Sequence, residues 1–197
     1  MAFLNKVKQA AWNLISLLRS NGWAVENTEM ELTGIFAGIP VKGKADLVLR
    51  RGDEQAIVDL KWSGVNRRKE LIKNGEDLQL ILYAHLLQPV EVWPHTAYFI
   101  LDEGKMIARN TAAFKEAMVA GQPNEDHENA CRIIFEKMEK TYAWRRAQLE
   151  KGQLEIRTAR TAPELELFYE GQLFELLEMK DEDARWDDYR TLLSVEV

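Results

Sequence analysis

Two aspartates and a lysine stand in an otherwise apolar pair of predicted strands, within the stretch VKGKADLVLRRGDEQAIVDLKWSG of residues 41–64. Residues two apart on a strand point to the same face, so Asp59 and Lys61 project together. An antiparallel turn at 51–54 then brings Asp46 near Asp59, and two carboxylates repel each other unless a cation lies between them. Because strand interiors are depleted in aspartate and lysine, these residues indicate either an exposed face or a site.

A divalent metal ion is the cation that this pair of carboxylates predicts. The set offers oxygen ligands with no histidine or cysteine nearby in the sequence, which favours Mg²⁺ or Mn²⁺ over zinc. Such a metal would polarise a scissile phosphate and lower the pKa of a bound water, while Lys61 would orient that water or stabilise developing charge. The alternative is a cross-strand ion pair between Asp46 and Lys61 on a solvated face. The strand IVDLK is of the buried, apolar type, which favours the site.

The elements that must hold these residues follow from the hydrophobic pattern. An amphipathic helix over residues 3–20 ends at SNG, and three β-like runs after it predict an antiparallel meander. A helix over about 66–87 comes next, followed by a strand or hairpin that turns at DEG, two helices at about 110–120 and 125–151, and a closing helix with an irregular end. The apolar stripe expected on the first helix consists of Phe3, Leu4, Val7, Ala10, Ala11, Leu14, Ile15 and Leu18.

The composition predicts an ordered protein. The chain has 197 residues, of which 46% are hydrophobic and 29% charged, so it is long enough to bury a core in one domain, with or without an appendage. Its single cysteine, Cys131, excludes an internal disulfide framework and any site that needs four thiolates. We find no apolar run of membrane-spanning length and no continuous signal-peptide core at the N-terminus, so we expect an intracellular, cytoplasmic location without a membrane partner.

Charge is unevenly distributed along the chain. The formal net charge is −6, but residues 163–197 hold eleven Asp or Glu and three Lys or Arg, so this tail carries −8 and the rest of the chain +2. Residues 42–73, with the RRK of Arg67 to Lys69, hold nine basic and five acidic residues, and residues 130–162 hold eight and four. These two segments are either phosphate-facing patches or ordinary solvated faces.

Three motifs in order carry a resemblance to a known family. GKADLVL, AIVDLKWS and DLQLILYAHLL resemble the motifs of the RecB/AddB-type branch of the PD-(D/E)XK nuclease superfamily. In that family a Gly-x-x-Asp strand supplies the first carboxylate, and a following (D/E)-x-K strand supplies the second together with a lysine. These correspond to Asp46, Asp59 and Lys61, and the family commonly adds to the metal shell the main-chain carbonyl between the last acid and the lysine, here that of Leu60. The segments YAWRRAQLEKGQLEIR and WDDYRTLL also resemble the C-terminal part of helicase-associated members.

The family's helix motif, Gln-x-x-x-Tyr, matches Gln79 and Tyr83. Residues four apart share a helix face, so this amide and this phenol could reach a phosphate or hold Lys61 in place. The alternative is that Tyr83 belongs to an apolar core stripe and that Gln79 is a surface residue.

The sequence departs from the family pattern in three places. Many relatives carry a His or Glu metal ligand in the first helix, but residues 2–20 contain neither, so Glu31 on the first strand is the candidate replacement unless it points outward. One cysteine cannot hold the iron–sulfur cluster of some relatives, so we expect none. The sequence also lacks the GKS/T loop of a helicase, so any motor must lie on another chain or another part of the protein.

The resemblance implies an α/β domain with a central mixed sheet of four or five strands flanked by helices, as in restriction endonucleases. We expect this nuclease-like domain to span residues 1–162 and the acidic extension to span 163–197. The implied function is a Mg²⁺- or Mn²⁺-dependent DNA exonuclease, the nuclease module of a recombination or repair helicase–nuclease with a helicase subunit or domain as partner. The alternatives are a catalytically weakened DNA-binding scaffold and a stand-alone Cas4-like or phage-type nuclease. Trp62, next to Lys61, either stacks on a base or packs in the fold.

Overall fold

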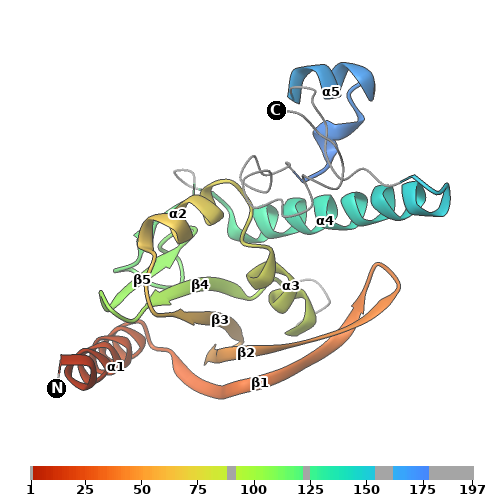
Figure 1. Cartoon of the computed structure of the whole chain (residues 1–197). Helices are drawn as coiled ribbons and strands as arrows, with labels where there is room; N and C mark the ends of the chain where they lie inside the picture. Colours follow the sequence, from red (N-terminus) through yellow and green to blue (C-terminus); the bar gives the residue numbers. More distant parts are fainter. Residues whose placement is uncertain (1, 88–91, 122–124, 154–161, 178–197) are drawn as a thin grey trace. The chain divides into compact units, whose positions relative to one another are not determined.

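The computed structural model describes residues 2–87, 92–121, 125–153 and 162–177 of the chain. The chain divides into two compact units, Met1–Glu139 and Lys140–Val197, which we describe separately. Figure 1 labels their helices and strands. Within the described ranges, no helix combines the length and the apolar character needed to cross a membrane.

The first unit is built on a mixed six-stranded sheet, which confirms the predicted α/β fold with flanking helices. Its strands follow one another across the sheet in chain order: β1 (Ala24–Phe36), β2 (Ile39–Arg51), β3 (Glu54–Lys61), β4 (His95–Ile100), β5 (Lys105–Ala108) and β6 (Met118–Val119). The pairs β1–β2, β2–β3 and β4–β5 are antiparallel, as the predicted meander and hairpin require. The pairs β3–β4 and β5–β6 are parallel.

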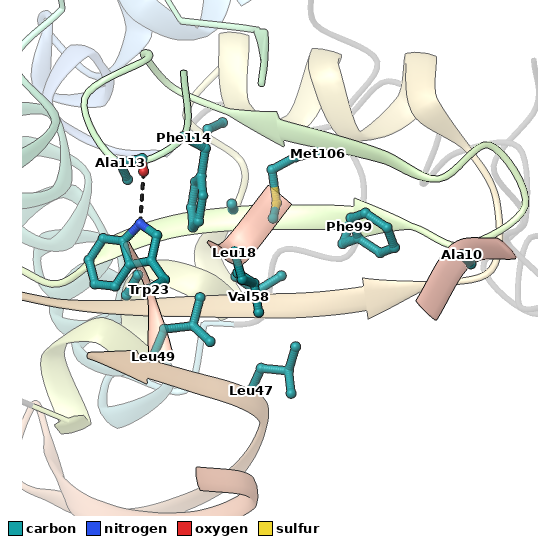
Figure 2. Packing of buried hydrophobic residues seen from close by; sticks show 13 residues of the cluster. Ala10, Leu18, Trp23, Leu47, Leu49, Val58, Phe99, Met106, Ala113 and Phe114 are labelled. Atoms are coloured by element: carbon teal, nitrogen blue, oxygen red, sulfur yellow. Dashed lines mark hydrogen bonds between the residues drawn. The ribbon is translucent and has the colours of Figure 1, made fainter. Parts of the chain in front are cut away.

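Helices cover the two faces of this sheet. Helix α1 (Ala2–Ser20) contributes to one core cluster, with Val58, Phe99 and Met106 from the strands (Figure 2). Helices α2 (Val65–Lys73) and α3 (Leu78–Leu87) contribute to the other, with Ile57, Tyr98 and Ile107 from the strands. The crossover from β3 to its parallel neighbour β4 therefore runs through α2 and α3, on the face toward which Ile57, Asp59 and Lys61 project.

Helix α1 has the predicted extent, but only part of its apolar stripe is buried. Of the predicted stripe, Ala10 and Leu18 are buried and Leu14 packs against the core, whereas the other five residues are exposed. Among them Phe3 is 62% and Leu4 64% exposed. The core therefore covers only part of the predicted apolar stripe.

The helix predicted over 66–87 is interrupted. Helix α2 ends at Lys73, and Gly75 has φ +68°, a left-handed conformation that glycine adopts without strain. Asp77, just before α3, is buried, and its carboxylate accepts two hydrogen bonds of 2.8 Å from Arg109. This ion pair lies just before α3 and sets where that helix begins.

The helix predicted over 110–120 is wrong. The segment is irregular and ends in β6, although alanine and lysine favour helices. Its backbone groups bind tertiary partners instead: the Ala113 carbonyl accepts from Trp23 Nε1 at 2.8 Å (Figure 2), and the Lys115 N–H donates to Asn21 Oδ1 at 2.9 Å. Because Phe114 is fully buried, packing overrides the local preference.

The second unit begins within helix α4 (His127–Glu150), which matches the prediction over 125–151. Helix α5 (Ala162–Phe168) and the 3₁₀ turn η1 (Gln172–Glu175) follow it. Within this unit the Trp144 and Tyr169 rings lie 5.3 Å apart, and Lys140 pairs with Glu175. These elements fit the closing helix that was predicted, whereas its irregular end and the motif WDDYRTLL lie outside the described residues.

Candidate active site

Strands β2 and β3 separate beside the first predicted carboxylate. Their ladder ends at Leu47 opposite Val58, although its register would next place Asp46 opposite Asp59. Instead, Asp46 Oδ2 accepts a hydrogen bond of 2.7 Å from the Leu60 backbone N–H. Ala45 and Leu47 pack into opposite core clusters, so the alternation of β2 is interrupted at Asp46. The irregularity lets the Asp46 carboxylate replace a backbone partner of β3.

Asp59 is buried on β3, with only 3% of the residue exposed. Lys61 Nζ lies 2.9 Å from its Oδ1 and 2.7 Å from its Oδ2, but only the Oδ1 contact has hydrogen-bond geometry. Burial raises the pKa of Asp59, the charge and hydrogen bond of Lys61 oppose that shift, and the Asp46 charge adds to it. The structure thus brings Asp46, Asp59, Leu60 and Lys61 together, and among the described residues it leaves the buried Oδ2 of Asp59 without a hydrogen bond.

Gln79 and Tyr83 interact with each other and with β2. Gln79 Nε2 donates to Tyr83 Oη at 3.1 Å, and the Lys44 backbone N–H donates to the same oxygen at 3.4 Å. The Tyr83 ring packs on Gly43, where an added Cβ would lie 2.3 Å from ring atom Cε1. The Gly-x-x-Asp and Gln-x-x-x-Tyr motifs are therefore in contact. Tyr83 also packs against the core and Gln79 is exposed, as the alternative interpretation predicts. Contact of this pair with a phosphate or with Lys61 stays a prediction.

Glu31 lies further along the β1–β2 hairpin. It stands opposite Lys44 in the register, its side chain is exposed, and it lines a shallow hollow of about 280 Å³ with Lys42, Gly43 and Lys44. In the described part of the chain, no three His, Cys, Asp or Glu residues are grouped closely enough to hold a metal ion. Within those residues, Asp46 and Asp59 are thus brought together without a third acidic side chain.

Trp62 follows directly on the Lys61 end of β3. It is 41% exposed, and its ring lies 5.0 Å from that of Phe3 on α1. Its backbone is fixed, because the Asp102 N–H donates to the Trp62 carbonyl at 3.0 Å and the Leu101 N–H to the Lys61 carbonyl at 2.8 Å. The indole is therefore an accessible aromatic surface on a backbone segment that is held in place directly after β3.

The structure separates the two arginines of the RRK motif. Arg67 is exposed, whereas Arg68 is half-buried and lies over the Tyr98 ring, with Cζ 5.4 Å from the ring centroid. The sequence prediction grouped them in one patch. The signal that distinguishes them is helical spacing, since Arg68 falls three after Val65 and four before Ile72, the two buried residues of α2.

The second predicted basic segment, residues 130–162, spans the boundary between the two units, and its Arg145 and Arg146 belong to the second. Arg146 is exposed and pairs with Glu150 at 2.9 Å, which compensates its charge locally. Arg145 lies over the Trp144 ring, 5.0 Å from its centroid. Whether this patch faces phosphates stays a prediction.

Comparison with known families adds an independent finding to this geometry. The family model described as PD-(D/E)XK nuclease superfamily matches residues 3–161. Searches of curated proteins and of solved structures gave no significant match.

The residues present fit the divalent metal that this superfamily typically uses. Mg²⁺ commonly binds proteins through one or two carboxylates and completes its shell with water and phosphate oxygens. Asp46 and Asp59 supply two carboxylates, and the buried Asp59 Oδ2 lacks a hydrogen bond within the described chain. Burial raises the pKa of Asp59, so a cation beside it would stabilise the ionised form.

Proposed function

Because the chain belongs to the PD-(D/E)XK nuclease superfamily, we propose that it is a metal-dependent deoxyribonuclease whose active site lies where β2 and β3 separate. A domain of this superfamily has nucleic acid as its substrate. The observation that carries the proposal is the convergence of Asp46 and Asp59 beside Lys61, joined by the 2.7 Å hydrogen bond between Leu60 and Asp46. Two carboxylates can hold a metal that activates water and polarises a phosphate, and the lysine adds a positive charge beside them.

In this proposal Asp46, Asp59 and the main-chain carbonyl of Leu60 hold Mg²⁺ or Mn²⁺, and Glu31 stays the candidate for a third side-chain ligand. The metal, when bound, supplies a Lewis acid for the scissile phosphate and lowers the pKa of a bound water. Lys61 then stabilises the charge that develops on the phosphate, or orients the attacking water. Its ammonium already lies at the Asp59 carboxylate, 2.7 Å from Oδ2.

Gln79 and Tyr83 have a supporting role in the proposed site. Their hydrogen bond to each other and the contact of Tyr83 with Gly43 link α3 to the strand that carries Asp46. In this proposal the pair reaches a phosphate of the bound DNA strand. The contact between the two motifs supports the proposed RecB/AddB-type branch.

The finer function that we propose is an exonuclease acting in DNA recombination or repair, with a helicase subunit or helicase domain as partner. Residues 1–162 form the nuclease domain in this proposal, and residues 163–197 form an acidic extension. The likeness of YAWRRAQLEKGQLEIR to helicase-associated members supports that context.

A DNA-binding scaffold without catalysis is the second candidate. It is favoured by one observation: Lys61 contacts both Asp59 oxygens, so this charged pair is balanced without a metal. A scaffold needs no third acidic ligand, and the described residues group none with Asp46 and Asp59.

Cleavage of end-labelled DNA with Mg²⁺ or Mn²⁺ tests the proposed function. Linear single strands and blunt duplexes should be shortened from an end, whereas circular single strands and closed plasmids should stay intact. Cleavage of the circular single strands or closed plasmids would contradict the exonuclease assignment but would still support a nuclease. If the protein binds DNA but cleaves none of these substrates, the scaffold function replaces the nuclease function.

A further inference from the structure

Arg68 lies on the buried side of α2, on the face of the sheet that carries the proposed active site. Its Cζ is 5.4 Å from the centroid of the Tyr98 ring. Tyr98 on β4 stands directly opposite Asp59 in the parallel β3–β4 ladder, so the two side chains project from the same face. The guanidinium therefore lies above the immediate neighbour of Asp59. Its positive charge also lowers the pKa of Asp59, opposing the effect of burial.

Among the described residues, this guanidinium has no anionic partner. In the described part of the first unit, three arginines are at least half-buried. Arg51 pairs with Glu54 at 2.7 Å and Arg109 with Asp77 at 2.8 Å, but Arg68 forms no ion pair with any described carboxylate. Its Nε is buried and lacks a hydrogen-bond partner there. Leaving a desolvated charged donor unpaired is unfavourable, so the arrangement calls for an anionic ligand.

The acid opposite Tyr98 on the neighbouring strand and the acid two positions along the same helix do not supply that ligand. Asp59, the acid on the facing strand, is already engaged by Lys61 at 2.7 and 2.9 Å. Glu70, on the same helix, is exposed and lies 3.9 Å from Lys73. The guanidinium lies over the Tyr98 ring, and its terminal N–H groups are the ones that would bind a planar or tetrahedral oxyanion. In a nuclease the oxyanion that reaches such a position is a phosphate of the bound strand.

We propose that Arg68, supported by Tyr98, forms a phosphate-binding subsite that holds one specific phosphodiester group of the DNA strand beside the Asp59 site. The inference rests on the proposed function and adds that the bound DNA strand is held at one fixed position relative to the active site. Arginine suits this role because its planar fork donates two parallel hydrogen bonds to phosphate oxygens, which lysine does not. Arg67, one residue earlier and exposed, is expected to make no such contact.

Binding measurements in the Asp59→Asn background test the subsite without cleavage. The probe is a fluorescein-labelled oligothymidylate, compared with versions in which one linkage at a time is a neutral methylphosphonate. Arg68→Gln should weaken binding about tenfold, the order expected for a lost charge-assisted hydrogen bond, and flatten the salt dependence by about 0.7. Arg68→Lys should recover the salt slope but not the full affinity. Arg67→Gln, the matched control, should change affinity less than about twofold.

The methylphosphonate series identifies the contact itself. With Arg68 present, one neutral linkage should reduce affinity about tenfold, and Arg68→Gln should abolish that penalty at that position alone. Thermal melts separate this effect from misfolding, and Arg68→Met keeps the aliphatic stem on Tyr98 if the glutamine variant is unstable. Equal penalties at all linkages in folded variants would overturn the subsite while leaving the nuclease proposal intact. Failure of Asp59→Asn to bind any DNA, with a wild type that cleaves none, would overturn both.

Discussion

The backbone N–H of Leu60 donates a hydrogen bond to Asp46 Oδ2 at 2.7 Å, in the place where the β2–β3 ladder has already ended. A side chain of one strand thus replaces a backbone acceptor for the other. The bond fixes the Asp46 carboxylate beside Asp59 and keeps its second oxygen available for a cation. The geometry of the proposed metal site is therefore a consequence of how the two strands separate.

Asp59→Asn should abolish cleavage without unfolding the protein. Burial raises the pKa of Asp59, so the fold disfavours the ionised form, and an amide removes that unfavourable charge. Without metal, we expect an unchanged or higher melting temperature at neutral pH. Mn²⁺ should raise the melting temperature of the wild type but not that of the Asp59→Asn variant.

The stability difference between the Asp59→Asn variant and the wild type should depend on pH. A raised folded-state pKa contributes stability below the unfolded-state value, and that contribution is lost as the pH rises through the folded-state value. In metal-free melts, the stability advantage of the Asp59→Asn variant over the wild type should therefore grow from acidic to neutral pH. Asp53→Asn, in the exposed β2–β3 turn, is the control and should keep both cleavage and the Mn²⁺ effect.

Lys61→Met separates catalysis from a scaffold role. If the ammonium stabilises charge that develops only in the transition state, single-turnover cleavage should fall by about 10² to 10³ while DNA binding changes little. If Lys61 only balances the buried Asp59 charge, the variant should instead melt earlier and cleavage should be absent even in the wild type. Lys105→Met, which breaks the surface pair of Lys105 with Glu103, should affect neither property.

Much of the site was predictable because it depends on local spacing. The β-like runs and the turn signals between them correctly predicted β1, β2 and β3, and the two-residue spacing of Asp59 and Lys61 correctly placed them on one face. The antiparallel turn also brought Asp46 to the end of β3, where its carboxylate accepts a hydrogen bond from the Leu60 N–H.

What escaped prediction depends on contacts between distant residues. The break between α2 and α3 depends on Arg109, 32 positions after its partner Asp77. The irregular segment before β6 depends on Trp23 and Asn21 from the other end of the unit. Periodicity in one helix likewise could not reveal that the sheet supports only part of α1.

Gly43→Ala should disturb the contact between the Gly-x-x-Asp motif on β2 and the Gln-x-x-x-Tyr motif on α3. The added Cβ would lie 2.3 Å from Tyr83 Cε1 and 2.9 Å from Cζ, so the ring must move. We expect a loss of about 1–3 kcal/mol in the free energy of unfolding, measured by urea denaturation, as for other overpacked sites. Tyr83→Ala should remove most of that penalty in the double variant, because it deletes the clashing ring. Additive losses would show that the two residues are not coupled.

Trp62→Ala should weaken binding of single-stranded DNA if the indole stacks on a base beside the active site. The ring is 41% exposed and its backbone is fixed by the Asp102 N–H, so a base can stack on it at little entropic cost. A stacked base contributes about 1–3 kcal/mol, so affinity for oligothymidylate in the Asp59→Asn background should fall roughly tenfold. An abasic oligonucleotide of equal charge should bind both proteins equally. Trp12→Ala removes another indole, 64% exposed on α1, and should leave both affinities unchanged. If the abasic strand also loses affinity for the Trp62 variant, Trp62 packs against Phe3 to support the fold and does not read bases.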